Sequence, residues 1–407
     1  MSSVFSRTIE VCATCEATDL VKALELAIDD DRILVKKGIH LASEVIVEKA
    51  VEITGEPGAV LDGQGKTILY VHHDSVTIRD IELRNVETNY VEDRAALKCN
   101  NSDYLNINNI KVRQSFFGIL LENSKHGLIQ SCDIQGEANE QNYLESSNGN
   151  AIHLWYCKHM KIINNTVKQH RDGIYFEFVE NSTIRGNHSQ GNMRYGLHFM
   201  FSHHNDYQQN VFTENGAGVA VMYSDHVTMT ENQFIDNWGG SAYGLLLKDI
   251  KDSKLENNIF KENTIAISAD NSVRIEIKNN RFVRNGYALR IMGNCTDNII
   301  QENDFAENSF DVTTNAKSNF NDFTGNYWEE YTGYDLDRDG VGDVPFRPVK
   351  LFTYIIAQSP ASIILMRSTF IDLLNLAEKV TPVITPETLV DNQPKMKPIN
   401  DHLKFGF

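Results

Sequence analysis

From Gly118 to Trp328, short apolar segments alternate with polar turn residues in one recurring pattern. Each repeat starts with Gly-apolar-x-apolar; Asn-x-Phe follows about ten residues later, with another Asn three residues beyond it. The motifs that fit are Asn210/Phe212/Asn215, Asn232/Phe234/Asn237, Asn258/Phe260/Asn263, Asn280/Phe282/Asn285 and Asn303/Phe305/Asn308. They begin 22, 26, 22 and 23 residues apart. A nearly fixed period of strand-like triplets and turn residues is typical of a solenoid.

The residue types in the repeat indicate which solenoid forms. Helix formers do not dominate, whereas Asn is abundant, and Asn tolerates turns and can hydrogen-bond along a stacked ladder. We therefore predict an all-β fold, a right-handed single-stranded parallel β-helix of about 22–23 residues per coil. Each coil would advance the axis by one strand spacing, about 4.8 Å.

The N-terminal segment predicts a cap and irregular first coils. Thr18–Asp30 is amphipathic and is expected to form a helix that covers the open end of the β-helix. Its apolar side consists of Leu20, Ala23, Leu24 and Ala27. Short strands are predicted at Ile33–Val35, Val45–Val47, Val51–Ile53, Ile68–Val71, Val76–Ile78 and Ile81–Leu83. Two later insertions, Gly136–Asn148 and Trp238–Ser241, are expected to be loops on one face, which is often the binding face.

The C-terminal segment predicts a second helix. Ser359 is a plausible N-cap with Pro360 at the first helical position, and the helix is expected to run to about Val380. One face carries Ile363, Met366, Phe370, Ile371, Leu374 and Ala377, while Arg367, Asp372, Asn375 and Lys379 lie off it. The last 26 residues hold four of the eight prolines and are expected to form an extended tail. The chain thus divides into an N-terminal segment with a capping helix (1–31), the β-helix (32–330), an Asp-rich loop (331–349), and a C-terminal helix with its tail (350–407).

Composition narrows the classes of partner and compartment. The formal net charge of −17 argues against nucleic acid as the main partner. The sequence has no run of 18 apolar residues, as a spanning helix would need, and the first twenty residues show no signal peptide. A cytoplasmic location and removal of a signal with a supplied Met are both compatible with this. Cys12 and Cys15 form a CxxC that suits a disulfide, inert thiols or a metal, and the other four cysteines are expected to be buried.

Strand alternation assigns outward positions in each Gly-led strand, and these align into two columns. One column is His153, Tyr175, His198, Ala220 and Leu246; the other is Trp155, Glu177, Met200, Met222 and Lys248. Leu197, Phe199 and Phe201 are expected to point inward. Outward Met is informative because the solvent face of a strand usually carries polar side chains.

A thioether beside an imidazole suits Cu(I) better than hard cations. Because Met200 and Met222 are expected on adjacent coils with His198 on the same face, we predict a copper site at these three residues. His153 and Glu177 are further candidate ligands. Histidines and a methionine at nearby turns favour a metal: His203, His204, His226 and Met229. The alternative is an aromatic and Met patch covered by a loop, a helix or a partner.

An Asp-rich loop follows the repeats. Positions 1, 3, 5, 7 and 9 of a calcium-loop spacing are occupied by Asp335, Asp337, Asp339, the Val341 carbonyl and Asp343. Gly340 stands at position 6, but Phe346 takes the place of the bidentate Glu at position 12. The loop therefore predicts either a partial calcium site or an Asp-rich turn without metal.

An enzyme is the competing interpretation, because parallel β-helices often act on acidic polysaccharides. The nearest candidate cluster is His170-Arg171-Asp172, with Glu177 beyond it. Glycoside hydrolysis needs two carboxylates facing each other across a groove, and the outward carboxylates lie on non-adjacent coils. His170 also occupies the place of a ladder Asn, which favours a structural role. We therefore predict that the chain is not an enzyme.

Four segments in this order carry a family resemblance: Arg194–Val227, Tyr243–Phe260, Asn326–Phe352 and Ser359–Lys379. They contain "YGLHFMFSHH", "YGLLLKDIKD", "DLDRDGVGD" and "SPASIILMRS". Together they resemble the NosD family of periplasmic accessory proteins for nitrous oxide reductase maturation. The resemblance covers most of the chain and is densest from Gly173 to Val380.

The resemblance implies a non-enzymatic periplasmic β-helix that works with an ABC-type ATPase and its membrane subunit. The implied task is assembly of the copper centres of nitrous oxide reductase, with a copper donor protein as a further partner. The C-terminal helix would then dock onto the membrane subunit, whereas its apolar face by itself is equally compatible with packing against the end of the β-helix. No ligand residue is carried over from the family, so the copper residues rest on the column argument. A carbohydrate-active protein and a metal-free scaffold remain the alternative functions.

Overall fold

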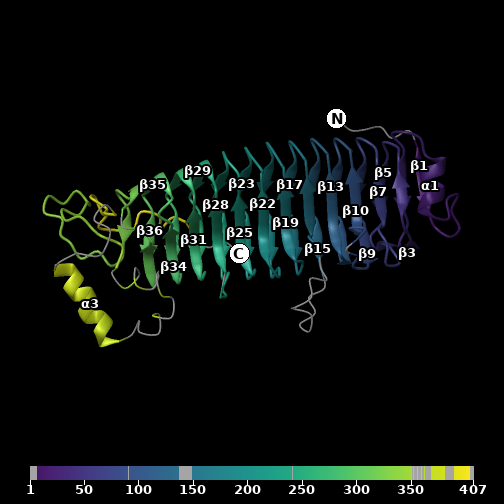
Figure 1. Ribbon diagram of the computed structural model, residues 1–407. Coiled ribbons are helices and arrows are strands. Elements are labelled where there is room, and N and C mark those ends of the chain that lie inside the picture. The colour runs from purple at the N-terminus through teal and green to yellow at the C-terminus, as the bar shows by residue number, and fades with distance from the viewer. Residues whose placement is uncertain are drawn as a thin grey trace. The chain divides into compact units, whose positions relative to one another are not determined.

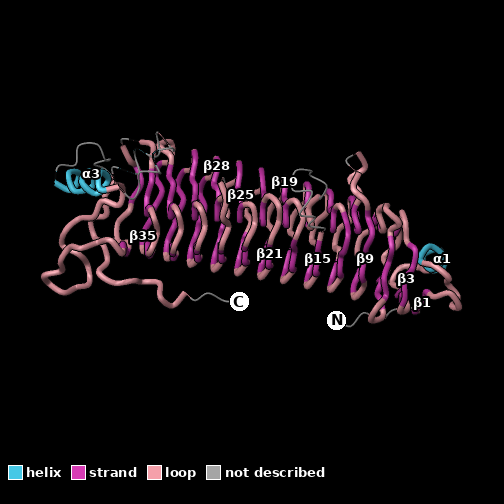
Figure 2. Tube along the Cα trace, turned by 90° about the horizontal axis from the view of Figure 1, so that it is seen from below, coloured by secondary structure: helices cyan, strands magenta, loops and turns pink. Residues whose placement is uncertain are grey.

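The computed structural model describes residues 7–89, 91–136, 149–240, 242–316, 318–350, 352, 355, 359, 362, 368–380 and 389–403. They fall into two compact units, Met1–Val211 (the first unit) and Phe212–Phe407 (the second unit). In both units each coil contributes one strand to each of three parallel sheets, named here sheets A, B and C (Figures 1 and 2). The fold class is the predicted one, a right-handed parallel β-helix.

The strands of the first unit pair in order within each sheet. Sheet A contains β1 (Thr8–Val11), β2 (Arg32–Val35), β5 (Glu52–Gly55), β8 (Thr77–Arg79), β11 (Asn106–Asn108), β14 (Leu128–Gln130), β17 (Lys161–Ile163), β20 (Thr183–Arg185) and β23 (Asp206–Gln208). Sheet B contains β3 (Gly38–Leu41), β6 (Ala59–Asp62), β9 (Glu82–Val86), β12 (Lys111–Ser115), β15 (Asp133–Gln135), β18 (Thr166–Lys168) and β21 (His188–Gln190). Sheet C contains β4 (Val45–Val47), β7 (Leu69–Val71), β10 (Ala95–Asn100), β13 (Phe117–Glu122), β16 (Ile152–Trp155), β19 (Asp172–Glu177) and β22 (Tyr195–Met200).

The second unit repeats this pattern, and β24 (Val211–Thr213) spans the division between the units. Sheet A contains β26 (Thr228–Thr230), β29 (Lys251–Glu256), β32 (Val273–Lys278), β35 (Thr296–Gln301) and β38 (Phe320–Asp322). Sheet B contains β27 (Gln233–Ile235), β30 (Ile259–Lys261), β33 (Arg281–Val283), β36 (Asp304–Ala306) and β39 (Tyr327–Trp328). Sheet C contains β25 (Ala217–Met222), β28 (Tyr243–Lys248), β31 (Ile265–Asp270), β34 (Tyr287–Ile291) and β37 (Phe310–Thr313).

The repeat residues form the interior ladders that the sequence predicts. In the second unit the backbone N–H of Asn232 donates to Asn258 Oδ1 at 2.9 Å, and Asn258 donates in the same way to Asn280. Phe234, Phe260 and their counterparts stack with ring centroids 4.3–5.0 Å apart along the run that ends at Trp328. Each ladder Asn thus satisfies buried backbone groups of the neighbouring coil, which the turns could not otherwise pair.

The N-terminal helix caps the first unit but is shorter than expected. It is α1 (Leu20–Leu26), with Asp19 as its N-cap accepting from the Lys22 N–H at 2.8 Å. The predicted apolar side is buried, as expected. The helix ends before Asp30 because Ala27 is extended and the buried carboxylate of Asp31 accepts from the Ile28 N–H, which fixes a turn there.

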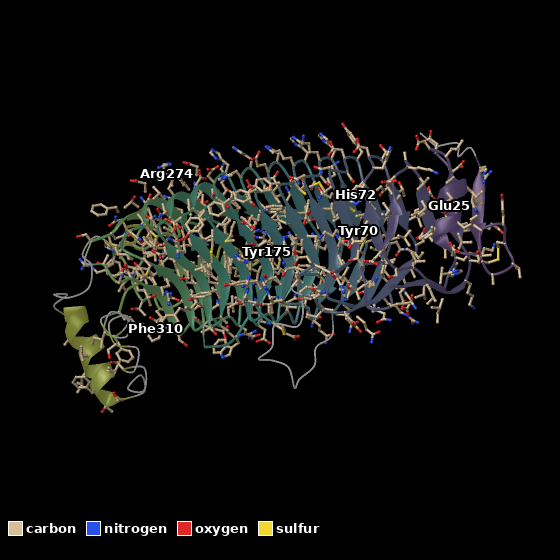
Figure 3. The ribbon with its side chains drawn as sticks, turned by 45° about the vertical axis from the view of Figure 1, so that its right-hand side comes forward. Glu25, Tyr70, His72, Tyr175, Arg274 and Phe310 are labelled. Carbon is tan, nitrogen blue, oxygen red and sulfur yellow. A yellow bond between two sulfur atoms is a disulfide. The ribbon has the colours of Figure 1, made fainter. Side chains whose placement is uncertain are left out.

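The C-terminal segment differs more from expectation. The described helix is α3 (Thr369–Val380), and residues 360, 361 and 363–367 of the predicted helix lie outside the described residues. Ile371 packs against Phe310 and Phe352, and Figure 3 shows Phe310 beside the helix. The predicted apolar face is therefore split, since Phe370 is 61% exposed. No helix within the described ranges is long and apolar enough to cross a membrane.

Residues 389–403 of the predicted extended tail are hydrogen-bonded to coils of the second unit. The Asp391 carboxylate is buried and accepts from the backbone N–H groups of Gly325 and Asn326 and from the Trp328 indole at 2.8–2.9 Å. Further along, the Asn400 N–H donates to Asp304 at 2.8 Å. One buried carboxylate can hold a segment that has little apolar surface, which is why hydrophobic patterning gave no sign of it.

Candidate functional site

The outward columns on sheet C have the predicted register. His153 pairs with Tyr175 and Tyr175 pairs with His198, while Glu177 pairs with Met200. In the second unit Ala220 is in register with Leu246, and Met222 with Lys248. The structure therefore places His153, Glu177, His198 and Met200 together in the first unit. Met222 lies on β25 of the second unit, and its proximity to Met200 stays a prediction.

The column that carries His198 is covered rather than open to solvent. Tyr175 is 9% exposed and His198 is 6% exposed, whereas Met200, Glu177 and His153 are half-buried. Aromatic rings provide the cover: the His198 ring lies 5.1 Å from the Tyr175 ring and 4.8 Å from the Tyr195 ring, between centroids. Figure 3 places Tyr175 on the strands of the first unit.

A buried carboxylate anchors this cluster. Asp172, at the start of β19, accepts two hydrogen bonds from the Arg194 guanidinium, at 3.0 Å and 2.7 Å. The same guanidinium lies 3.1 Å from His198 Nδ1. Burial opposes ionisation of Asp172, but the guanidinium groups of Arg194 and Arg171 outweigh it and hold the pKa of this carboxyl below its usual range.

Burial shifts the neighbouring groups toward their neutral forms. Desolvation lowers the pKa of His153 to about 4, so its imidazole is neutral and able to ligate near neutral pH. Burial, with Glu177 nearby, raises the pKa of Tyr175 to about 12. The Tyr175 hydroxyl donates to Glu177 at 3.3 Å, which links the two columns.

The donor set fits a soft cation. His198 Nε2 is buried and has no hydrogen-bond partner among the described residues, which leaves one polar atom uncommitted inside an aromatic enclosure. Met200 stands two residues along the same strand face and supplies a thioether. An imidazole beside a thioether favours Cu(I) over calcium or magnesium, and the nearby Asp172 carboxylate is already paired with Arg194.

Several sequence expectations near this site are wrong. Phe201 is 38% exposed instead of pointing inward, because its φ of 49° turns the chain out of the strand. It stacks there on Phe178, and Phe178 on Tyr156, forming an external aromatic ladder. Met229, expected at a surface turn, is buried in the core on β26 and is not available as a surface ligand.

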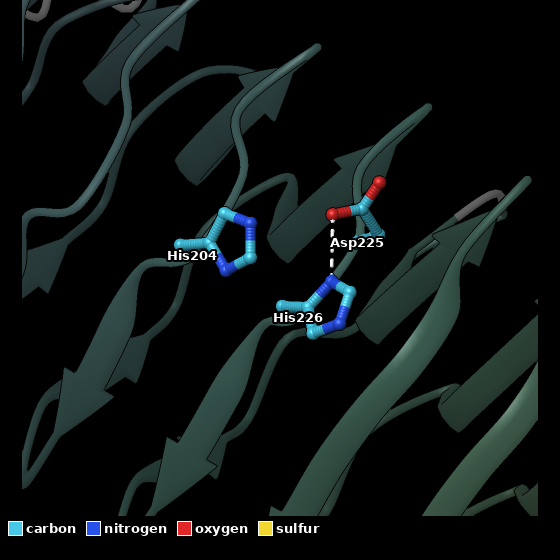
Figure 4. A group of neighbouring side chains, drawn as sticks. All are labelled: His204, Asp225 and His226. Carbon is cyan, nitrogen blue, oxygen red and sulfur yellow. Dashed lines mark hydrogen bonds and ion pairs between the residues drawn. The ribbon is translucent and has the colours of Figure 1, made fainter.

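Of the turn histidines, His204 and His226 are exposed and His203 is half-buried. In the second unit His226 Nδ1 lies 2.9 Å from the Asp225 carboxylate (Figure 4). Figure 4 also draws His204, which belongs to the turn after β22 in the first unit. An Asp–His pair of this kind is a common surface feature, and its metal role stays a prediction.

The structure brings three acidic residues of the Asp-rich loop together. Carboxylate oxygens of Asp335, Asp337 and Asp339 lie within 4.8 Å of one another. Gly340 has the predicted turn conformation, with φ of 85°, but Asp343 turns back to accept from the Leu336 N–H at 2.7 Å. The carboxylates already accept backbone N–H groups, such as Asp339 from Val341 at 2.7 Å. Calcium in this loop stays a prediction.

The cysteines follow their expected types. Cys12 and Cys15 form a disulfide, so their thiolates are not available as metal ligands. The other four cysteines are buried, and desolvation raises the pKa of the Cys132 and Cys157 thiols to about 12.

Sequence reasoning missed Arg194, the residue that connects Asp172 to His198. A signal was present, because Arg171-Asp172-Gly173 and Arg194-Tyr195-Gly196 precede successive Gly-led strands. Aligning the two strands on Gly places Asp172 beside Tyr195, as the observed register does. The Arg194 side chain one residue earlier then reaches Asp172.

Comparisons with known proteins find one matching family model, two similar relatives and solved structures with the same fold. Residues 137–333 match the model of a family described as "Periplasmic copper-binding protein (NosD)". The chain is 27% identical over 371 residues to the "Probable ABC transporter binding protein NosD" of Stutzerimonas stutzeri, covering 86% of this chain and 84% of the relative. The protein of the same name from Pseudomonas aeruginosa is 28% identical over 377 residues, which cover 88% of this chain and 86% of the relative.

Solved structures share the fold alone. The Dettilon tailspike protein superposes with a TM-score of 0.57 at 10% identity, over 76% of this chain and 69% of its own. The A-module of the mannuronan C-5 epimerase AlgE6 from Azotobacter vinelandii superposes with a TM-score of 0.55 at 11% identity. The superposition covers 76% of this chain and 94% of the module. The chain is therefore similar to the two NosD proteins over most of its length, and the segment that matches the family model contains the cluster around His198.

Proposed function

We propose that this chain is a copper-handling periplasmic protein of an ABC-transporter complex that supports metal-centre assembly in nitrous oxide reductase. It would bind and pass on Cu(I) as cargo and would not itself be an enzyme. The observation that carries the proposal is the His198–Met200 pair on β22, with a buried and unpartnered imidazole nitrogen. It lies inside the segment that matches the periplasmic copper-binding family.

The proposed partners are an ABC-type ATPase, its membrane subunit, nitrous oxide reductase and a copper donor protein. The printed name of the two relatives, ABC transporter binding protein, supports the first two. On α3, Phe370, Leu373 and Leu376 are 59–65% exposed, which leaves an apolar stripe that a membrane subunit could cover. A periplasmic location also suits the Cys12–Cys15 disulfide, because such bonds persist in oxidising compartments.

Two alternative functions are weaker on this geometry. A carbohydrate-active enzyme would need Asp172 or Glu177 as an acid or base at a groove. Asp172 is fully buried and held by Arg194, so its carboxylate does not face a substrate. A metal-free scaffold gives no role to the unpartnered His198 nitrogen, whereas a copper ligand does.

The test is a Cu(I) titration of the purified protein against a colorimetric Cu(I) chelator under reducing conditions. Wild type is compared with the His198→Ala/Met200→Ala/Met222→Ala variant. The matched control is His126→Ala/His159→Ala, which removes two exposed imidazoles of the first unit that stack with centroids 4.9 Å apart. Tight binding that is lost in the triple variant and kept in the control supports the proposal. Absence of tight binding in the wild type would favour the metal-free scaffold.

A further inference from the structure

The contact between Arg194 and His198 determines which ring nitrogen of His198 can carry the proton. Its Nδ1 lies 3.1 Å from a terminal nitrogen of Arg194. A guanidinium has only donors, so Nδ1 must be the acceptor of this hydrogen bond. In a neutral imidazole the ring proton then resides on Nε2, because the bond made by one nitrogen fixes the proton on the other.

In this arrangement both nitrogens of His198 are therefore unavailable to a cation. The lone pair on Nδ1 is taken by Arg194, and Nε2 carries the proton. That N–H is buried and finds no acceptor in the part of the chain that the structure describes. A buried donor without an acceptor is unfavourable, so this arrangement persists only because Arg194 imposes it.

Asp172 is placed to stabilise the opposite tautomer. Its Oδ2 lies 3.8 Å from His198 Nδ1, just beyond hydrogen-bond distance, with the Arg194 guanidinium contacting both groups. If Arg194 moved aside, a small ring movement would let Nδ1–H donate to this carboxylate. Metal-ligating histidines usually donate their second N–H to a carboxylate or carbonyl, which fixes the ligating tautomer and raises ligand basicity.

Exposure identifies the group that can move. The side chain of Arg194 is 44% exposed, whereas those of Asp172 and His198 are 0% and 8% exposed. Arg194 can therefore swing into solvent and keep its charge hydrated, while the other two groups stay enclosed within the coil. Arg171, 3.8 Å from Asp172 Oδ2, keeps a positive charge near the carboxylate when Arg194 leaves.

We propose that Arg194 and Asp172 are positioning residues that gate copper at His198. In the copper-free protein Arg194 holds His198 as the Nε2–H tautomer. On loading, Arg194 moves to solvent, Nε2 loses its proton to water, and Nδ1 takes one from water and donates it to Asp172. The exchange leaves the charges of all three side chains unchanged and requires no oxidant. The inference rests on the proposed function and adds how the access of copper to His198 is controlled.

The first experiment reads the tautomer without copper. Protein labelled with nitrogen-15 at histidine is measured by long-range proton–nitrogen correlation, and the His198 signals are assigned by their loss in His198→Gln. Wild type is expected to show the Nε2–H pattern, and Arg194→Met a shift toward the Nδ1–H pattern. An Nδ1–H or doubly protonated His198 in the copper-free wild type would overturn the proposal.

The second experiment measures the Cu(I) dissociation constant against a chelator. Arg194→Met is expected to lower it by roughly threefold or more, because the competent fraction rises. Asp172→Asn is expected to raise it by about 10–100-fold, as loss of the carboxylate behind a ligating histidine does. Arg84→Met is the matched control, because Arg84 pairs with Asp62 of the neighbouring coil at 3.2 Å without a histidine. It should leave the constant unchanged.

The two readouts separate the possible failures. No tight Cu(I) binding by the wild type would refute the proposed function, while the tautomer measurement would still test the hydrogen bond from Arg194. Tight binding that depends on His198 but is unaffected by Arg194→Met and Asp172→Asn would overturn the gate alone. Should Asp172→Asn fail to fold, Arg194→Met carries the same test, since Arg171 and the Tyr195 N–H still contact Asp172.

Discussion

The outer face of sheet C has the same strand geometry in the two units but carries different side chains. In the first unit, one of its two outward columns is His153, Tyr175 and His198. Asp172 and Arg194 lie at the edge of this column. In the second unit the corresponding positions are Ala220, Leu246 and Ser268. The backbone ladder fixes where outward side chains stand, so chemistry can be added to one coil without altering the next.

The two units also differ in the Asn ladders of their interior. The second unit has two uninterrupted Asn ladders. In one, Asn258, Asn280 and Asn303 each accept the backbone N–H of the Asn on the coil before. In the other, to which the His170 position belongs, Asn263, Asn285 and Asn308 do the same. In the first unit His170 occupies a ladder position, and its backbone N–H donates to Asn192. The irregular ladder therefore lies in the unit that holds the charged cluster, whereas the regular unit is the more purely structural one.

Breaking the regular ladder should have the largest effect. Asn258→Ala removes the acceptor for the Asn232 N–H and the donor to the Met229 carbonyl, both buried. We expect a loss of about 4 kcal/mol in the free energy of unfolding and a Tm about 10 °C lower. Thermal unfolding followed by circular dichroism measures this. The exposed Lys254→Ala on the same coil should change Tm by less than about 1 °C, and an equal effect of both variants would contradict the ladder argument.

The buried carboxylate that holds the C-terminal segment comes next. Asp391→Ala leaves two backbone N–H groups and the Trp328 indole without their acceptor. The free energy of unfolding is expected to fall by about 3 kcal/mol. Hydrogen exchange should show faster exchange at Gly325 and Asn326 and no change at β19. Uniformly faster exchange throughout both units would mean that the anchor is not local.

Copper binding sharpens the comparison between the two faces. His198→Ala should weaken Cu(I) binding at least about 100-fold, or about 2.7 kcal/mol, whereas Ser268→Ala at the corresponding column position should leave it unchanged. The same titration of Met200→Ala and Met222→Ala tests the prediction that both thioethers share the ion. Equal losses for the two variants support a shared ion. A loss confined to Met200→Ala restricts the site to the first unit.

Acid should destabilise the first unit through His170. Burial lowers its pKa to about 4, below the usual 6.5, so the unfolded chain binds more protons between these values. Stability is therefore fully present above pH 6.5 and falls as the pH drops toward 4. His170→Asn restores the ladder residue and removes the titrating group. Its effect on the free energy of unfolding should therefore be more favourable at pH 4.5 than at pH 7 by about 2 kcal/mol. Urea unfolding at both pH values measures this, and an unchanged difference would refute the role of His170.

The Asp-rich loop is expected to give the smallest effect. About 1 mM Ca²⁺ should stabilise the second unit by about 1 kcal/mol if the loop binds as weakly as extracellular calcium modules do. Asp337→Asn should abolish the increase in Tm, and Mg²⁺ serves as the control ion. An equal Ca²⁺-dependent increase in the Tm of wild type and variant would mean that calcium binds outside this loop.

Residues that repeat were predictable, and residues that occur once were not. The Asn and Phe positions, the outward columns and the burial of four cysteines follow from period and alternation. Arg194, Asp391 and Phe201 do not, because each acts through a contact with a different coil or leaves the strand at a left-handed turn. In the cluster, alternation predicted the outward column positions of His198 and Met200 but not Arg194, which connects Asp172 to His198.

By itself, the sequence determined the coil period, the parallel β-helix and the face on which each strand residue stands, because these depend on local alternation and on the repeat length. The tertiary structure alone decided that His198 is buried, that Asp172 is paired, and that the C-terminal segment packs onto the second unit. Burial and ion pairing depend on side chains about twenty or more residues apart, whose distances are fixed only when the coils stack.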